Sequence, residues 1–210
     1  MQKQSSNHFH RLLAVCALAL GALFGAQMSA SVVIEPFAYD LNEDGTAAIA
    51  VFRDFAMENF DGNLEIPSTI EYEGKTYKVT TINRAVLASK NLVSLTLGKY
   101  VRTLGSLSVA YNPQLTTLTF NEELETIESE AFSGDTGITS ITLPQSLKTL
   151  CAKAFYNTGL SGTFTVPASV DSLANGVVQG MKKITAIAVE PGNKKDRKST
   201  RLNSSHTPQS

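Results

Sequence analysis

The amino-acid sequence predicts a β-rich solenoid, a stack of 23-residue coils with a narrow parallel sheet and an N-terminal β cap. The first observation is an apolar position that recurs at a constant step of 23, at Leu95, Leu118, Ile141, Phe164 and Ile187. The second is that polar residues flank the first four of these positions, the alternation typical of a short half-buried strand. The third is length, because a unit this short buries its apolar residues only by stacking on its neighbours.

Residues 1–30 are predicted to be a secretory signal peptide. Lys3 and Arg11 supply positive charge, an apolar run covers Leu12–Phe24, and small residues follow it. The run is shorter than the ~20 residues that span a bilayer. A lipoprotein anchor at Cys16 is the alternative, but Val15 stands where such a site requires a small residue. We therefore expect an exported protein, at the cell surface or extracellular, without a transmembrane span in the mature chain.

Residues 31–60 are predicted to form the N-terminal β cap, which closes the open end of the core. Val32–Tyr39 and Thr46–Phe52 have the composition of two strands around a turn at Asn42–Gly45. The solenoid proper is expected over residues 61–195. Its first coil carries an insertion at 71–77 (EYEGKTY), in which Glu73-Gly74 suits the tip of a hairpin.

Residues 196–210 are expected to lie outside the fold. The segment Asp196–His206 (DRKSTRLNSSH) can be back-translated into a string that resembles a widely used short-read sequencing adapter. A genuine basic, serine-rich tail is the alternative. We expect this segment to be disordered and the solenoid to be truncated at its C-terminal end, with the natural protein continuing beyond residue 195.

Two segments of the chain resemble the BspA-type leucine-rich repeats of bacterial surface proteins. They are LEIPSTIEYEGKTYKVTTI at 64–82 and LTTLTFNEELETIESEAFSGDTGITSITLPQSLKTLCAKAF at 115–155. The shared marks are Ile-Pro or Leu-Pro after the strand, an isoleucine four residues before Ala-Phe, and the 23-residue step. The resemblance implies a solenoid that takes part in adhesion to host proteins or to other cells. Ordinary leucine-rich repeats carry Asn or Cys three residues past the strand; this chain does not, so no asparagine ladder is expected.

Charge and residue types exclude several function classes. Residues 31–195 hold 13 Lys and Arg against 18 Asp and Glu, which argues against a nucleic-acid partner. Cys151 is the one cysteine of this range, and all three histidines, His8, His10 and His206, lie outside it. These facts rule out Ser-His-Asp triads, Cys-His dyads and histidine-based metal sites there. We therefore expect no catalytic residue, no metal and no cofactor.

Three weaker signals have simpler explanations. Residues 40–45 (DLNEDG) match the first half of a calcium loop, but Val51 occupies the position that requires a bidentate glutamate, so a hairpin turn is preferred. Cys151 is expected to be a small filler. A group of glutamates in one coil is expected to be solvated and not to form an acid–base pair: Glu122, Glu123, Glu125, Glu128 and Glu130.

The outward strand positions carry hydroxyl groups in four successive repeats. They are Ser94, Thr96, Thr117, Thr119, Ser140, Thr142, Thr163 and Thr165, the candidate partner-binding residues. Thr is also a good strand former, so the pattern has a purely structural explanation. We expect a non-catalytic interaction protein that binds a protein or a cell-surface glycan through this face. The alternative is a polysaccharide-active parallel β-helix enzyme, which would place charged groups on the same face.

Overall fold

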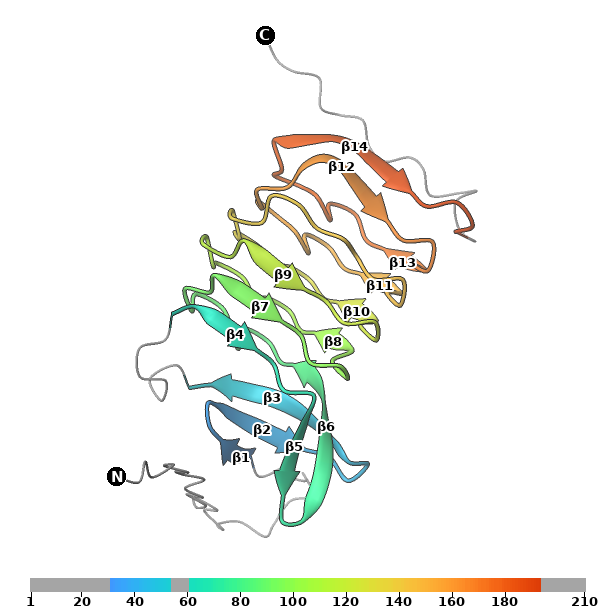
Figure 1. Ribbon diagram of the computed structural model, residues 1–210. Helices are drawn as coiled ribbons and strands as arrows, with labels where there is room; N and C mark the ends of the chain where they lie inside the picture. The colour runs from blue at the N-terminus through green and yellow to red at the C-terminus, as the bar shows by residue number, and fades with distance from the viewer. Residues whose placement is uncertain (1–30, 54–60, 194–210) are drawn as a thin grey trace, which may run out of the picture.

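The computed structural model describes residues 31–53 and 61–193, and these form a rod of stacked coils (Figure 1). The predicted β-rich solenoid is confirmed. Its strands are β1 (Ser31–Ile34), β2 (Phe37–Leu41), β3 (Thr46–Phe52), β4 (Asn63–Glu65), β5 (Thr69–Tyr72), β6 (Lys75–Ile82), β7 (Ser94–Thr96), β8 (Thr103–Leu104), β9 (Thr117–Thr119), β10 (Thr126–Ile127), β11 (Thr149–Leu150), β12 (Ser161–Val166), β13 (Ser172–Leu173) and β14 (Lys183–Val189). Within the described ranges, no helix has the length and apolar character needed to cross a membrane. The expected signal peptide and the expected terminal segment lie outside the described residues.

The first side of the solenoid contains the predicted strands, but in two separate sheets. Strands β4, β7 and β9 are parallel and in register, with Leu64, Leu95 and Leu118 aligned. Strands β12 and β14 form a second parallel pair. Between them, residues 139–143 follow a similar course without being paired as a strand (Figure 1). The strand predicted around Ile141 is therefore wrong for this coil, and Ile141 is only half-buried.

The second side of the solenoid is a longer sheet that the sequence analysis did not anticipate. Two-residue strands β8, β10, β11 and β13 pair in parallel and continue a sheet that begins with β1, β2, β3 and β6. Each contributes one hydroxyl residue and one apolar residue, as in the aligned pairs Thr126–Thr149 and Ile127–Leu150. Two residues are too few to display an alternating pattern in a sequence, so periodicity alone could not reveal these strands.

The third side consists of turns, yet its backbone is also hydrogen-bonded from coil to coil. The N–H groups of Leu107, Val109 and Tyr111 donate to carbonyl groups in the next coil, at N–O distances of 2.8–3.1 Å. The same pattern recurs one coil later. Each coil has at least two positions with positive φ here, for example Glu130 at 59° and Gly134 at 79°. Because these bonds satisfy the backbone between coils, the turns can stack as regularly as strands do.

The shared interior is a continuous apolar column. Phe132 and Phe155 stack face to face with ring centroids 5.3 Å apart and planes 2° from parallel. Phe120 and Phe164 extend this aromatic row at centroid distances of 6.0 and 5.7 Å. Burial of such rings is the main favourable term that holds one coil on the next.

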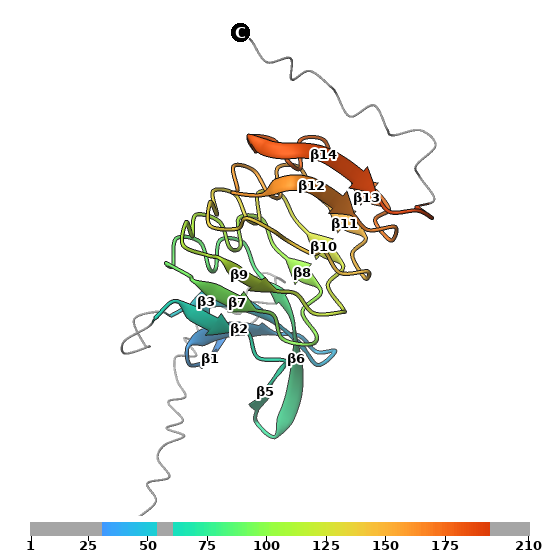
Figure 2. The same ribbon diagram turned by 45° about the horizontal axis from the view of Figure 1, so that its top comes forward.

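The N-terminal segment lies at one end of the rod. The segment predicted as one strand, Val32–Tyr39, is two antiparallel strands, because the chain reverses at Glu35–Pro36. The β2–β3 hairpin lies beside β6, so it is placed where a cap would be, although residues 54–60 of that region are outside the described part. The predicted insertion is confirmed: β5 and β6 are antiparallel around Glu73-Gly74, both with positive φ, and the hairpin projects from the rod (Figure 2).

Candidate functional site

The hydroxyl groups predicted to bind a partner form two rows on the first side of the solenoid. Thr117, Thr119, Ser140, Thr142, Thr163 and Thr165 are exposed, whereas Ser94 and Thr96 are half-buried. Ser94 aligns with Thr117 and Thr96 with Thr119, so the register brings these residues together as expected. The rows lose their strand pairing at Ser140 and Thr142, and they end at alanines of β14.

Few of these hydroxyl groups are engaged within the protein. Ser94 Oγ donates to Asn63 Oδ1 at 2.7 Å. In the described part of the chain, no hydrogen bond occupies the hydroxyl groups of Thr119, Thr142 or Thr165. These groups can both donate and accept, so the exposed rows offer regularly spaced polar contacts without a formal charge.

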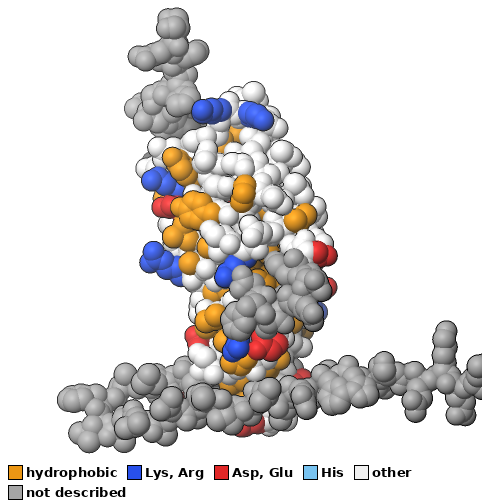
Figure 3. All heavy atoms as spheres, turned by 90° about the vertical axis from the view of Figure 1, so that its left-hand side faces the viewer, with side chains coloured by type: hydrophobic (Ala, Val, Ile, Leu, Met, Phe, Trp, Pro, Cys, Tyr) orange, Lys and Arg blue, Asp and Glu red, His pale blue; other side chains and the backbone are white. Residues whose placement is uncertain are grey.

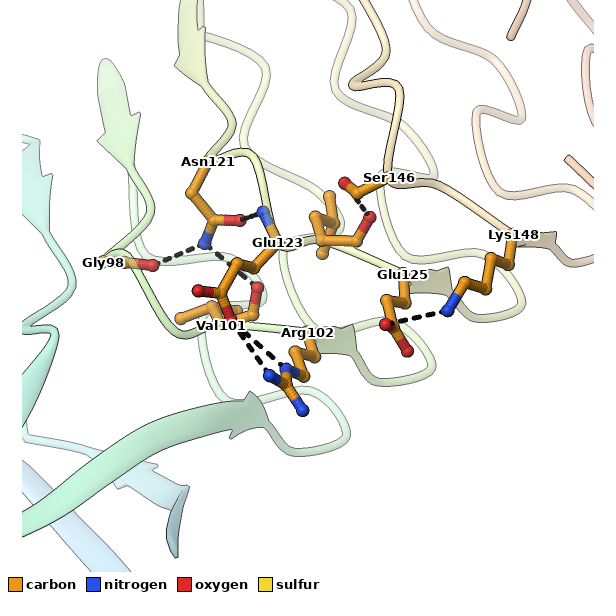
Figure 4. A network of polar contacts seen from close by, with 9 residues as sticks. Gly98, Val101, Arg102, Asn121, Glu123, Glu125, Ser146 and Lys148 are labelled. Carbon is orange, nitrogen blue, oxygen red and sulfur yellow. Dashed lines mark hydrogen bonds and ion pairs between the residues drawn. The ribbon is translucent and has the colours of Figure 1, made fainter. Parts of the chain in front are cut away.

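The charged corner between the first and second sides has a structural role (Figure 4). Arg102 pairs with Glu123 at 3.1 Å and Lys148 with Glu125 at 2.9 Å, each across one coil boundary. Asn121 adds a donated bond from Nδ2 to the Val101 carbonyl at 3.0 Å and another to the Gly98 carbonyl. These contacts bind one coil to the next and leave the charges of this corner largely neutralised.

The glutamate group is less solvated than the sequence suggested. Glu122 is exposed, but the other four members are half-buried. The Glu128 carboxylate accepts the Ser106 N–H at 2.9 Å, another contact between neighbouring coils. The glutamates therefore lie along the connecting segments as predicted, and three of them bind the adjacent coil.

A buried polar ladder lies at the start of the first side, and sequence reasoning missed it. Asn112 is 0% exposed; its Oδ1 accepts the N–H groups of Lys90 at 2.9 Å and Leu92 at 3.1 Å, and its Nδ2 donates to the Leu87 carbonyl at 3.0 Å. An asparagine therefore does link two coils by hydrogen bonds. The expectation that no asparagine ladder forms, which was drawn from the position three residues past the strand, is wrong. The signal was a second polar series at the 23-residue step, Asn112, Asp135 and Thr158.

Asp135 occupies the next rung of this ladder and is the least satisfied buried group there. Its Oδ1 accepts the Asn112 N–H at 2.6 Å, but Oδ2 is buried without a hydrogen-bond partner. Burial raises the pKa of this carboxyl to about 8, and the single bond from Asn112 offsets only part of that cost. Asp135 is therefore mostly protonated at neutral pH.

The calcium-loop match at residues 40–45 and the single cysteine of the described residues, Cys151, are both explained by local structure. Strands flank residues 40–45, and Asp44 Oδ1 accepts both the N–H and the hydroxyl of Thr46 at 2.9 and 2.7 Å, as in a hairpin turn. Cys151 is half-buried; burial, and secondarily Glu128, raises the pKa of its thiol, which disfavours the reactive thiolate. Within residues 31–53 and 61–193, no group of three or more His, Cys, Asp or Glu side chains is arranged to hold a metal ion.

Parallel coils around an apolar column, with short strands at a fixed repeat, define a leucine-rich repeat solenoid. The profile of the BspA type leucine rich repeat region matches residues 62–185 in six copies, more than half of the chain. The protein therefore belongs to the BspA-type leucine-rich repeat family. Comparison with curated protein sequences finds no match.

Solved structures of bacterial leucine-rich repeat proteins share the fold. One from Bacteroides ovatus is 20% identical, with a TM-score of 0.62 over 76% of this chain and 42% of that one. The T. pallidum leucine-rich repeat protein TpLRR is 17% identical, with a TM-score of 0.64 over 77% of this chain and 84% of that one. The pneumococcal vaccine antigen PcpA is 17% identical, with a TM-score of 0.60 over 79% of this chain and 51% of that one. At these identities the likeness concerns the fold alone.

Proposed function

We propose that this protein acts outside the cytoplasm, at the cell surface or in the extracellular medium, as a non-catalytic interaction protein. Membership of the BspA-type repeat family supports a non-catalytic repeat protein, and the apolar N-terminal run supports export. Its partner is a macromolecule, either a protein or a cell-surface glycan. An elongated repeat surface suits a large ligand because it offers the same contact at every coil.

The observation that carries this proposal is the exposed double row of hydroxyl groups. The hydroxyl groups of Thr119, Thr142 and Thr165 are exposed and make no hydrogen bond within the described residues. Each single contact through such a group is weak, so affinity would come from several coils acting together. The enzyme alternative gains no support from this face, since its outward positions hold hydroxyl groups and not the paired carboxylates of glycoside hydrolysis.

The test replaces Thr119, Thr142 and Thr165 together by lysine. The side chains point outward, so circular dichroism and melting temperature are expected to change little, apart from like-charge repulsion along the row. Binding to a panel of matrix proteins and partner cells is expected to fall by about tenfold or more, equivalent to about 1.4 kcal/mol.

A matched control adds the same three charges elsewhere. Thr69, Thr76 and Ser172 are exposed and belong to β5, β6 and β13, not to the strands that carry the hydroxyl rows, so their replacement by lysine should leave binding within about twofold of the parent. Equal loss in both triple variants would show a general charge effect. Full binding by a folded Thr119, Thr142, Thr165 variant would place the contact surface elsewhere.

A further inference from the structure

The third side of the solenoid presents a surface that neither the repeat family nor the hydroxyl rows account for. It consists of the segments that lead into the strands of the first side, residues 84–91, 107–114, 130–137, 153–160 and 176–182, together with Lys183, the first residue of β14. We propose that this surface, here called the tyrosine edge, binds an acidic polysaccharide through its two exposed tyrosines and its unpaired lysines. It is separate from the hydroxyl rows, and its ligand is independent of theirs.

The tyrosine edge carries an excess of positive charge on a chain whose overall charge is negative. Its exposed cations are Arg84, Lys153, Lys182 and Lys183. Its acidic residues are Glu130, which is half-buried, and Asp135, which is buried and mostly protonated at neutral pH. The outward charge of this edge is therefore clearly positive, although the formal net charge of the whole chain is −1.

These cations also differ from those of the opposite corner in having no ionic partner. Lys148 and Arg102 are each paired with a glutamate of a neighbouring coil (Figure 4). Among the described residues, no carboxylate pairs with Lys153, Lys182 or Lys183. A set of unpaired cations on one edge creates a positive potential that attracts an anionic ligand.

Two tyrosines on the same edge are both exposed and held in place. Tyr111 is 52% exposed and Tyr156 37%, whereas the other aromatic side chains of the described residues are buried or half-buried. The Tyr111 ring packs on Gly134 of the next coil, where an added Cβ would lie 2.9 Å from Cδ1, and the Tyr156 ring packs in the same way on Gly180. Each ring is thus held against the backbone of the next coil while more than a third of the residue stays exposed, so a ligand would contact it at little entropic cost.

The spacing and the surroundings favour a sugar polymer over a peptide. The two tyrosines are two coils apart, or about 10 Å along the axis at ~4.8 Å per coil, so one extended polymer can reach both. Lys153 Nζ lies over the Tyr156 ring, 5.6 Å from its centre, so a cation and an aromatic ring are adjacent at this position. A sugar acid needs this pairing, because its C–H face stacks on an aromatic ring while its carboxylate binds an ammonium group.

An acidic peptide fits this surface less well. The backbone groups of the third side already bond from coil to coil, as in Leu107 N–H to the Ser129 carbonyl at 3.1 Å, so no strand can be added there. Figure 3 views the molecule from the side on which the strands of the first side begin, and shows scattered hydrophobic side chains with Lys and Arg side chains, and some Asp and Glu side chains, around them. Isolated aromatic and aliphatic side chains suit sugar rings better than they suit peptide side chains, because peptide side chains bind in pockets.

The experiment measures binding of the purified chain to hyaluronan, dextran sulfate and neutral dextran at low and high salt. We expect the two acidic polymers to bind, more weakly at high salt, and dextran not to bind. Replacing Lys153, Lys182 and Lys183 by glutamine should weaken binding by about tenfold or more. The control replaces Lys75, Lys78 and Lys99 by glutamine, three exposed lysines beside tyrosines at the opposite end, and should stay within about twofold of the parent.

A second measurement locates the ligand directly. The chain has no tryptophan, so Tyr156→Trp supplies a fluorescence signal that reports on this position alone. Its emission should change when hyaluronan is added and should not respond to dextran. The variant with lysine at Thr119, Thr142 and Thr165 should lose no affinity for hyaluronan, since it removes no part of the tyrosine edge and adds positive charge, which separates this site from the hydroxyl rows.

Several results would overturn the proposal. One is equal loss of affinity in the two lysine-to-glutamine triple variants, which would indicate general electrostatics. Others are failure of both acidic polysaccharides to bind, or equally tight binding of poly-glutamate. An unchanged Tyr156→Trp emission at saturating hyaluronan would place the ligand elsewhere on the molecule.

Discussion

The unsatisfied carboxyl of Asp135 leads to a prediction about how stability depends on pH. Asp135 is 0% exposed, and only its Oδ1 atom accepts a hydrogen bond. The pKa of this carboxyl is about 8 in the folded protein, against an ordinary value of 3.8, because burial disfavours the charged form. In the unfolded chain the group is solvated and titrates near its ordinary value.

The sign and size of the effect follow from proton linkage. Between about pH 4 and pH 8 the unfolded chain has released this proton and the folded protein still holds it, so the free energy of unfolding falls as pH rises. The slope is about 1.4 kcal/mol per pH unit, or roughly 3 kcal/mol between about pH 5 and pH 7. Above about pH 8 both states are ionised and the contribution becomes constant.

Other shifted groups act outside this window. Hydrogen bonds lower the pKa of Asp44 and Asp61, so their stabilisation is lost only as pH falls below the ordinary carboxyl value. Burial raises the pKa of Tyr39 and Cys151, whose effects therefore appear in the alkaline range. The three histidines of the chain lie outside the described residues.

Asp135→Asn is expected to remove the slope and to raise stability at neutral pH by a few kcal/mol. An amide carries no charge to bury, and its nitrogen has acceptors, because the Phe132 and Ser133 carbonyls precede residue 135 as those of Val109 and Ala110 precede Asn112. Asn112 Nδ2 does donate to both of those carbonyls. Residue 135 would thus become a second asparagine rung of the buried ladder.

The assay is urea unfolding followed by circular dichroism, at several pH values between 5 and 8. Asp171→Asn, an exposed carboxyl replaced in the same way, is the control and should leave the slope of the parent unchanged. A parent protein whose stability is flat or rises over this range would show that Asp135 is ionised and hydrated. Loss of stability in Asp135→Asn would contradict the ladder geometry.

Three further predictions address packing. Leu150→Ala, at a fully buried position of β11, should cost about 2–5 kcal/mol in chemical denaturation, and a cost under about 1 would mean that the column is loosely packed. Gly134→Ala, at a φ of 79° and under a tyrosine ring, should cost clearly more than Gly74→Ala, at a φ of 72° with open space around it; equal melting temperatures would refute the ring contact. A double-mutant cycle on Arg102 and Glu123 should give about 0.2–1 kcal/mol and shrink in high salt, whereas a salt-independent coupling would contradict an exposed ion pair.

Much of the fold was predictable because a repeat shows its own register. The spacing of Leu95 and Leu118 predicted that they align in neighbouring strands, and they do. The hairpin at Glu73-Gly74 was predictable from its turn residues, since both adopt positive φ. The absence of a strand at Ile141 was not predictable, because the residues of this coil match those of coils that do form strands. Whether a strand pairs depends on the neighbouring backbone.

The candidate site was predictable only as far as side chains alternate along a strand. The outward direction of Thr119 and Thr165 followed from that alternation, and both are exposed. The tyrosine edge could not be found in this way, because Tyr111 and Tyr156 lie in turns and are not at equal positions of the repeat. Only the packing of each ring on a glycine of the next coil makes them comparable.

The sequence by itself determined the class of fold, the 23-residue step and the residues that face the shared core. These depend on hydrophobic burial, which has a period that can be counted along a chain. The tertiary structure alone decided which backbone groups pair between coils, that Asp135 is left with one unsatisfied oxygen, and that the unpaired lysines gather on one edge. Those features depend on distances between residues about 23 positions apart, and such distances exist only once the coils are stacked.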